Sequence, residues 1–197
     1  MKVSKEQNTQ NRNALIDAAS KLFQAQGFAA TGVAQISEEA GLTQGAFYAH
    51  FKSKTLLIQA ACQKAFSTCH GAWTAMKGTQ ANDLQTIIDS YVTPVHVDDP
   101  AEGCPMAAYA SEIKSQDEPV KDTFTEGLQN MVGILNELLA KDFSDEAARR
   151  NALFFMSSMV GSVALARATK STDPALAAEI ITATRESLLA VANAGAS

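Results

Sequence analysis

The sequence predicts an all-helical fold, and three observations support this prediction. Apolar residues recur at spacings of three and four through most of the 197 residues, as they do on the buried face of a helix. No stretch alternates apolar and polar residues for long enough to predict a strand. Each break in the helical pattern holds a glycine, proline, serine or threonine, the residues that end or begin helices.

The first 76 residues contain four predicted helices. Apolar residues at 15–23 form one face of the first helix, which Gly27 ends. Thr31 is the expected N-cap of a second helix of two turns, which ends at Gly41. A third and a fourth helix, at 44–50 and 54–76, have Thr43 and Ser53 as their expected N-caps.

The rest of the chain is predicted to form five helices. The segment 97–103 is the clearest loop, because acidic residues, Pro100 and Gly103 cluster there between two apolar patterns. The same periodicity and capping residues place the helices at 82–95, 105–115, 119–141, 144–170 and 173–194.

Charge is distributed unevenly along the chain. The net charge of −5 argues against a protein that binds nucleic acid by charge alone. Residues 1–60, however, contain six Lys and Arg against four Asp and Glu, whereas residues 61–197 contain ten against seventeen. This balance predicts one module that approaches phosphate and one that does not.

The N-terminus and the cysteines predict a cytoplasmic protein without a membrane span. The first ten residues are polar and lack the apolar core of a signal peptide, and no apolar run approaches the ~20 residues of a membrane helix. Three cysteines are an odd and sparse set, which fits reduced thiols better than a disulfide framework.

The segment 31–54, TGVAQISEEAGLTQGAFYAHFKSK, has the chemistry of a helix-turn-helix. Gly41 can adopt the left-handed conformation that a tight turn between two short helices requires. A helical hairpin that serves only as scaffold would share this spacing. The apolar residues expected to hold the two helices together are Ile36, Ala40, Leu42, Phe47 and Phe51.

The residues left facing outward carry hydroxyl, amide, phenol and imidazole groups, which can meet base edges and phosphates without repulsion. The helix N-termini at 31 and 54 add backbone N–H groups that favour a phosphate. We expect Thr43, Gln44 and Gly45 to contact bases, and Tyr48, His50, Lys54 and Thr31 to contact phosphates.

The pattern from Leu15 through Ala60 closely resembles the N-terminal domain of TetR/AcrR-family transcriptional regulators. Two positions depart from the family pattern: Ser37, where Ala is usual, and Phe47, where Leu is commoner. The resemblance rests on Phe23, Gly27, Phe28, Thr31, Gly41, Tyr48, His50, Phe51 and Lys54.

The resemblance implies a TetR-type DNA-binding domain at residues 10–70, with its motif at about 33–52, and a helical effector-binding and dimerisation domain at 71–197. It also implies a homodimeric repressor of a palindromic operator in double-stranded DNA, released by a small-molecule or thiol-reactive effector. The competing interpretation is an all-helical ligand carrier or enzyme in which the hairpin is scaffold only.

The last two long helices are the expected dimer contact, because small residues recur there at spacings of three and four, as close helix packing requires. The alternative is that these residues pack within one subunit. The small residues are Ser157, Gly161, Ala164 and Ala168.

Aromatic and methionine side chains are candidates for the wall of an effector pocket, since they form adaptable apolar surfaces. Apolar residues at helical spacing are also ordinary core, so the two interpretations compete for each residue. The candidates are Phe66, Trp73, Tyr91, Met106, Tyr109, Phe124, Met131, Phe155 and Met159.

Cys104 is a candidate redox sensor. Pro105 suits the first position of a helix, which places the Cys104 thiol at a helix N-terminus where the dipole favours a thiolate. The acidic side chains of Asp98, Asp99 and Glu102 oppose a thiolate, and an inert buried cysteine is the alternative.

The sequence does not predict an enzyme, a cofactor or a metal site. Three scattered histidines and the absence of a nucleophile motif argue against catalysis. Cys69 and His70 are adjacent on a predicted helix and point about 100° apart, so with Cys62 they do not form a metal site.

Overall fold

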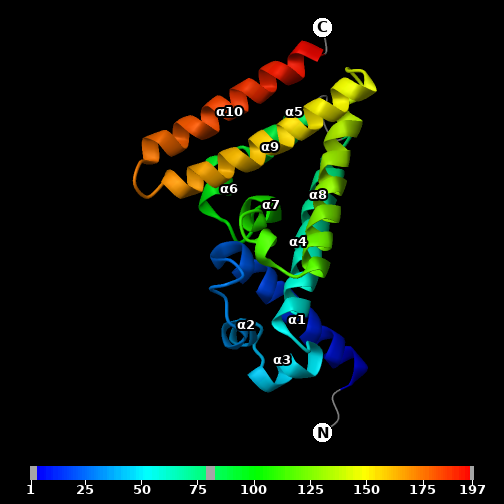
Figure 1. Ribbon diagram of the computed structural model, residues 1–197, viewed down its shortest axis with the longest axis vertical. Coiled ribbons are helices and arrows are strands. Elements are labelled where there is room, and N and C mark those ends of the chain that lie inside the picture. Colours follow the sequence, from blue (N-terminus) through cyan, green and yellow to red (C-terminus); the bar gives the residue numbers. More distant parts are fainter. Residues whose placement is uncertain (1–3, 79–82, 196–197) are drawn as a thin grey trace. The chain divides into compact units, whose positions relative to one another are not determined.

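The computed structural model describes residues 4–78 and 83–195, and within these residues every regular element is a helix. The predicted all-helical fold is therefore confirmed (Figure 1). In chain order the elements are α1 (Lys5–Gln26), α2 (Val33–Glu39), α3 (Gln44–His50), α4 (Lys54–Met76), α5 (Asp83–Tyr91), α6 (Pro94–Asp98), α7 (Pro105–Tyr109), the 3-10 helix η1 (Ile113–Ser115), α8 (Glu118–Leu139), α9 (Asp145–Thr169) and α10 (Pro174–Gly195).

The chain divides into two compact units, and the division does not follow the chain order. The first unit contains the residues up to Ser67 together with Pro100–Glu126, and the second contains Thr68–Asp99 and the residues from Gly127 onward. Both α4 and α8 contribute residues to each unit. The predicted boundary between residues 70 and 71 stays a prediction.

The first unit is built around α1. Helices α2 and α7 contact α1, and α3 contacts α2. Phe23 of α1, Ile36 of α2, Phe47 of α3 and Leu57 of α4 are fully buried, so each of the four N-terminal helices places an apolar side chain in one core. α1 begins earlier than its apolar face predicts, because the Ser4 side chain accepts a hydrogen bond from the Gln7 N–H and caps the helix.

The start of α2 differs from the prediction. Gly32, and not Thr31, is its N-cap. The Thr31 side chain is fully buried, and its hydroxyl donates a hydrogen bond to the carbonyl oxygen of Gly27, 2.8 Å away. Thr31 therefore closes the loop between α1 and α2 and cannot also cap the helix that follows it. The N-cap predicted for α3 is confirmed, since the Thr43 hydroxyl accepts from the Ala46 N–H.

Two helices predicted as continuous are interrupted. The helix expected at 82–95 is two helices, because Pro94 has no N–H to continue α5 and the Thr93 hydroxyl caps α6 at the His96 N–H. Its expected first residue, 82, lies outside the described residues. The helix expected at 105–115 ends at Tyr109, and after a turn the Ser115 and Gln116 N–H groups donate to the Glu112 and Ile113 carbonyl oxygens in the 3-10 helix η1.

The second unit is organised by the antiparallel pair of α9 and α10, which lie side by side (Figure 1). α5 contacts α10, and α6 contacts α9. α6 is fastened to α9 by Arg167, which donates to the His96 carbonyl oxygen at 2.7 Å, and by an ion pair between Lys170 and Asp98. Among the described residues only α9 is long and apolar enough to span a membrane, and its buried residues pack against α6 and α10 as in a core helix.

Candidate nucleic-acid interface

The turn between α2 and α3 is set by Gly41. Its φ is +67°, in the left-handed region that favours glycine, and a Cβ there would meet no atom within 4 Å. Backbone conformation, and not lack of space, therefore requires glycine. The Gly41 and Leu42 N–H groups donate to the carbonyl oxygens of Glu38 and Ser37, which closes the end of α2. Two consecutive hydrogen bonds make this a fixed turn.

An apolar seam joins α2 to α3. Ile36 and Phe47 are fully buried, Phe51 is nearly so, and the rings of Phe47 and Phe51 stack with centroids 5.9 Å apart. Ala40 and Leu42 are half-buried at the turn. Phe47, one of the two departures from the family pattern, thus takes the core position predicted for it, and the angle between the helices is fixed by packing.

The other departure, Ser37, is also buried. Its hydroxyl donates to the carbonyl oxygen of Val33 at 2.9 Å, so the polar group is satisfied within its own helix. This substitution leaves the α3 surface unchanged.

The outward surface of α3 is polar and has no acidic residue. Thr43, Gln44, Gly45 and Tyr48 are exposed, Tyr48 to 62%, and His50 is half-buried. A Cβ at Gly45 would meet only the Thr43 hydroxyl, at 3.8 Å, so the helix backbone is uncovered there. We call these residues the α3 face: Thr43, Gln44, Gly45, Tyr48 and His50.

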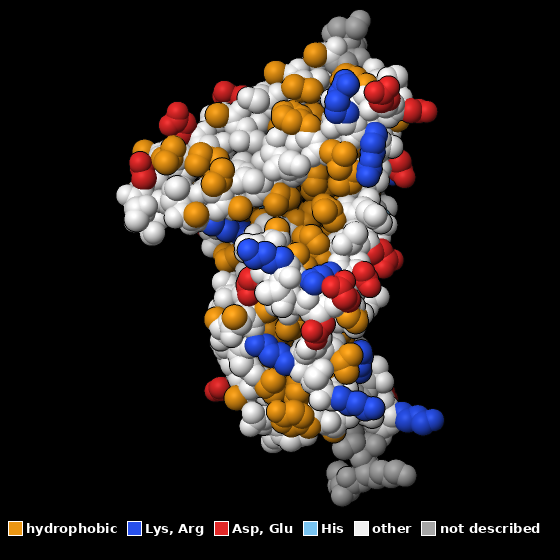
Figure 2. Space-filling view, viewed as in Figure 1, with side chains coloured by type: hydrophobic (Ala, Val, Ile, Leu, Met, Phe, Trp, Pro, Cys, Tyr) orange, Lys and Arg blue, Asp and Glu red, His pale blue; other side chains and the backbone are white. Residues whose placement is uncertain are grey.

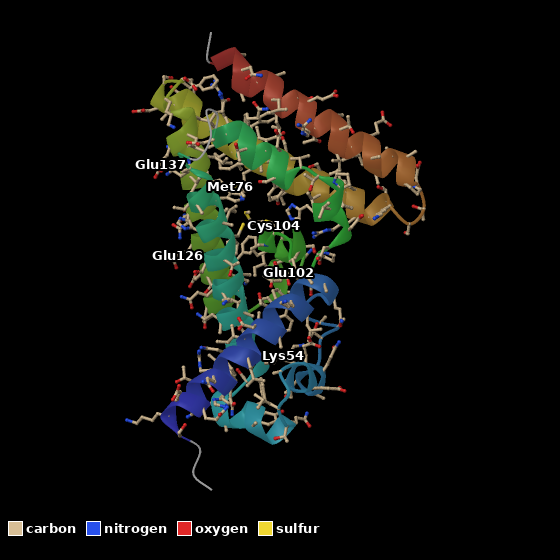
Figure 3. The ribbon with its side chains drawn as sticks, turned by 180° about the vertical axis from the view of Figure 1, so that it is seen from behind. Lys54, Met76, Glu102, Cys104, Glu126 and Glu137 are labelled. Carbon is tan, nitrogen blue, oxygen red and sulfur yellow. The ribbon has the colours of Figure 1, made fainter. Side chains whose placement is uncertain are left out.

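Two residues predicted to contact phosphate are engaged inside the first unit. The buried hydroxyl of Thr31 is bonded to the Gly27 carbonyl oxygen. Lys54 is half-buried at the start of α4, and its ammonium group donates to the carbonyl oxygen of Phe28 at 2.5 Å (Figure 3). Both side chains hold the loop between α1 and α2, so we leave them out of the proposed interface.

Arg12 is a candidate that the sequence analysis missed. It is exposed on α1, and its guanidinium lies 5.0 Å from the centre of the Phe51 ring, at the end of α3. Such stacking orients a cation without neutralising it. Figure 2 shows Lys and Arg side chains over the N-terminal part of α1. No sequence signal pairs residues 12 and 51, because their contact is made by the packing of α1 on the hairpin.

Cys104 is the N-cap of α7, as predicted. Its side chain is 2% exposed, and its sulfur accepts a hydrogen bond from the Met106 N–H at 3.3 Å. Glu102 is turned to Lys21, with a nitrogen–oxygen distance of 2.6 Å, and this partner raises the pKa of Lys21 (Figure 3). α7 has only five residues, so its dipole is small. The thiol is therefore buried, and the role of Cys104 as a redox sensor stays a prediction.

All nine residues predicted to line an effector pocket are buried. Within the first unit the rings of Phe66 and Phe124 are 5.5 Å apart, and within the second those of Trp73 and Tyr91 are 5.9 Å apart. Four belong to the first unit, namely Phe66, Met106, Tyr109 and Phe124, and five to the second, namely Trp73, Tyr91, Met131, Phe155 and Met159. Their role as a pocket wall stays a prediction.

One side of the α9–α10 pair is apolar and exposed (Figure 2). The small residues Ser157, Ala164 and Ala168 are exposed and Gly161 is half-buried, so the stripe faces away from the core of its own subunit. Leu153, Phe154 and Leu165 fall on the same roughly 120°-wide side of α9, at 100° per residue. A shallow groove runs between the two helices and is lined by Phe154, Ser158, Ala183, Thr184, Ser187 and Leu188.

In residues 4–78 and 83–195 no three His, Cys, Asp or Glu side chains group closely enough to hold a metal ion. On α4, Cys62 is fully buried whereas His70 is exposed. Burial raises the pKa of Cys62 to about 12, so this thiol stays protonated at neutral pH.

Comparison with known proteins gives two family matches that do not overlap. Residues 15–61 match the family described as "Bacterial regulatory proteins, tetR family", and residues 81–179 match "Transcriptional regulator LmrA/YxaF-like, C-terminal domain". The HTH-type transcriptional regulator LmrA of Bacillus subtilis is 25% identical over 175 residues, which cover 84% of this chain and 91% of LmrA.

Solved structures share the fold. A TetR transcriptional regulator from Legionella pneumophila has a TM-score of 0.78 at 16% identity, covering 97% of this chain and 99% of its own. The transcriptional regulator FadR from Bacillus subtilis, in complex with stearoyl-CoA, has a TM-score of 0.68 at 16% identity, covering 93% and 98%.

Proposed function

The chain belongs to the TetR family of DNA-binding transcriptional regulators, and on this premise we propose that it is a homodimeric repressor of a palindromic operator, released by a small apolar effector. Family membership confirms a regulator and not an enzyme, so the carrier or enzyme interpretation is set aside. We assign DNA reading to the α3 face, dimerisation to the α9–α10 pair, and effector binding to the buried aromatic and methionine residues.

The observation that most supports DNA reading by α3 is its polar, acid-free surface on a helix fixed by an apolar seam. The amide of Gln44 can form two hydrogen bonds with adenine, and uncovered backbone at Gly45 permits close approach to the groove. Tyr48 and His50 carry groups that bond phosphate oxygens. We assign base contacts to Thr43, Gln44 and Gly45, and phosphate contacts to Tyr48 and His50.

The exposed side of α9 and α10 supports the dimer. A short recognition helix contacts too few base pairs for useful specificity, and a twofold axis doubles the contacts on a palindrome. Small residues let two helix pairs approach closely, while Phe154 and Leu165, 46% and 58% exposed, supply apolar area that a partner copy would cover. The proposed contact is a four-helix arrangement of α9 and α10 from each subunit.

Two observations support an apolar effector. Each unit buries aromatic and methionine side chains, which repack readily around an apolar molecule. In addition, the structurally similar FadR binds stearoyl-CoA, a molecule with a long apolar chain. Release follows if the effector prefers a dimer whose two α3 helices no longer match successive major grooves.

The test begins with selection of an operator from random double-stranded DNA by the full-length protein. We expect a palindrome, bound with an affinity that falls steeply as salt rises. Gln44→Ala should lower operator affinity about tenfold and relax sequence preference at one position in each half-site. Tyr48→Ala should instead weaken binding to all DNA sequences alike. A reporter gene behind the selected operator then distinguishes repression from activation.

Gln63→Ala is the matched control, because Gln63 is an exposed glutamine of α4 that lies outside the α3 face. The proposal is wrong if Gln44→Ala and Tyr48→Ala remain folded and dimeric and both bind the selected operator as tightly as the wild type does.

A further inference from the structure

The loop between α1 and α2 is fastened from two other elements of the first unit. The N–H groups of Phe28 and Ala29 both donate to Oε2 of Glu112, at 2.9 and 3.3 Å. On the other side of the same residue, Lys54 of α4 donates to the Phe28 carbonyl oxygen. The peptide groups flanking Phe28 are thus held by an anion from residue 112 and a cation from residue 54.

The sequence before the loop makes room for the Glu112 carboxylate. Gly27 has a φ of +84° and a ψ of 167°, a conformation that essentially only glycine adopts. A Cβ built at Gly27 would collide with Oε1 of Glu112. Gly27 is therefore required twice, for the turn and for the approach of the carboxylate.

Apolar contacts support the same junction. The Phe28 ring packs between Phe23 and Tyr109, with centroids 5.3 and 4.7 Å away. Tyr109 is fully buried, which raises the pKa of its phenol, and its hydroxyl lies 3.4 Å from the Ser20 carbonyl oxygen that accepts from it. Glu112 thus lies three residues after a tyrosine that is packed in the core.

Glu112 lies in the segment Pro100–Glu126, which contacts α1 along much of its second half. Gln24 donates to the Ala101 carbonyl oxygen at 2.9 Å, and Lys21 pairs with Glu102. The peptide chain joins this segment at both ends to residues of the second unit.

We propose that Glu112 is a positioning residue for DNA binding: its carboxylate fixes the α1–α2 loop, and through it the angle at which α2 and α3 leave α1. The inference rests on the proposed DNA-binding function. Only four residues separate Phe28 from α2. Release of the two N–H groups therefore allows the angle between α1 and the α2–α3 hairpin to change. An effector that moves the Glu112 carboxylate away from the two N–H groups would disengage α3 from the operator.

The decisive comparison is between Glu112→Ala and Glu112→Gln in the full-length dimer, measured by operator affinity. Each substitution removes one negative charge, which by itself should tighten binding to DNA. A glutamine oxygen still accepts from the Phe28 and Ala29 N–H groups, whereas alanine does not. We expect Glu112→Ala to lower operator affinity about tenfold and Glu112→Gln to stay within about threefold of the wild type.

The matched control is Glu126→Gln, which removes the same charge from an exposed position in the same segment (Figure 3). It should leave affinity unchanged or slightly raised. Binding to unrelated DNA, which depends on charge more than on geometry, should change little in Glu112→Ala. An equal loss on operator and unrelated DNA would overturn the positioning role, as would equal affinity of both Glu112 variants.

A second measurement needs no substitution. Amide hydrogen exchange should find the Phe28 and Ala29 N–H groups protected in the DNA-bound wild-type protein, and exchange at rates typical of exposed amides would overturn the proposal. The two proposals fail in different ways. If the wild type selects no DNA, the proposed function is wrong, whereas if it binds an operator and Glu112→Ala binds equally well, only the Glu112 inference is wrong.

Discussion

The pairs α2–α3 and α9–α10 are both helical hairpins, yet they expose opposite chemistries. The first buries its aromatic residues in the seam and exposes hydroxyl, amide and phenol groups. The second exposes Leu153, Phe154 and Leu165 beside a stripe of small residues. The polar surface suits a hydrated, charged polymer, and the apolar one suits a protein surface of the same kind. This contrast is why we propose that one pair binds DNA and the other a second subunit.

The largest effect should come from a charge on the α9 surface. Leu165→Glu places a carboxylate where the partner subunit is expected to cover a leucine, and an unpaired charge there opposes association. We expect a monomer by light scattering, and a loss of operator affinity of about 100-fold because one half-site is no longer linked to the other.

Val95→Glu is the control for this change, because Val95 is a 75% exposed residue of α6, which belongs to the same unit. A Leu165→Glu protein that remains a dimer would place the subunit contact elsewhere and remove the contrast between the hairpins.

The second-largest effect is expected at Gly41, in the turn between α2 and α3. Gly41→Ala must adopt a φ of +67°, which costs an L-residue with a Cβ about 1–2 kcal/mol of stability, although the added methyl group meets nothing. Thermal unfolding measures the difference. Gly32→Ala is the control, since Gly32 has a φ of −92° and equally open surroundings, and an equal loss in both variants would show that strain at the turn is not the cause.

A smaller effect is expected at Arg12. If this stacked guanidinium contacts a phosphate, Arg12→Ala should reduce operator affinity about threefold. The slope of log affinity against log salt concentration should also fall by about one, because one fewer counterion is released. Arg12→Lys keeps the charge and should retain most of the affinity. Unchanged salt dependence in Arg12→Ala would exclude the phosphate contact.

The smallest effect concerns Cys62. Burial raises the pKa of this thiol in the folded protein to about 12, so between the ordinary thiol pKa and pH 12 the unfolded chain releases a proton that the folded chain keeps. Cys62 therefore adds stability below the ordinary thiol pKa, and this contribution is lost as the pH rises. Cys62→Ala should show a shallower decline of unfolding free energy between pH 8 and about 10.5 in urea titrations. Identical slopes for both proteins would contradict this.

Sequence patterns predicted the features that depend on neighbouring residues. The seam through Ile36 and Phe47, the turn at Gly41 and the cap at Thr43 follow from spacing and from the conformational preferences of single residues. The all-helical fold was predictable for the same reason. These signals are local, so they can be interpreted without knowledge of the rest of the fold.

What the sequence patterns did not predict depends on which groups the fold brings beside a side chain. Thr31 was predicted to be an N-cap, but its hydroxyl donates to the Gly27 carbonyl oxygen. The contact between the Lys54 ammonium group and the Phe28 carbonyl oxygen was not predicted, and phosphate binding by Lys54 stays a prediction. Glu112, 84 residues from Phe28, gives no signal in the sequence. Tertiary contacts of this length are set by packing, which spacing alone does not encode.

The placement of Pro100–Glu126 has a consequence for synthesis of the chain. When the ribosome has released only the four N-terminal helices, Phe28 has neither the Tyr109 ring beside it nor the Glu112 carboxylate on its N–H. The hairpin that we assign to the operator therefore has these contacts only after residue 112 has emerged. A nascent or truncated chain that ends earlier contains α3 without the contacts that we propose position it.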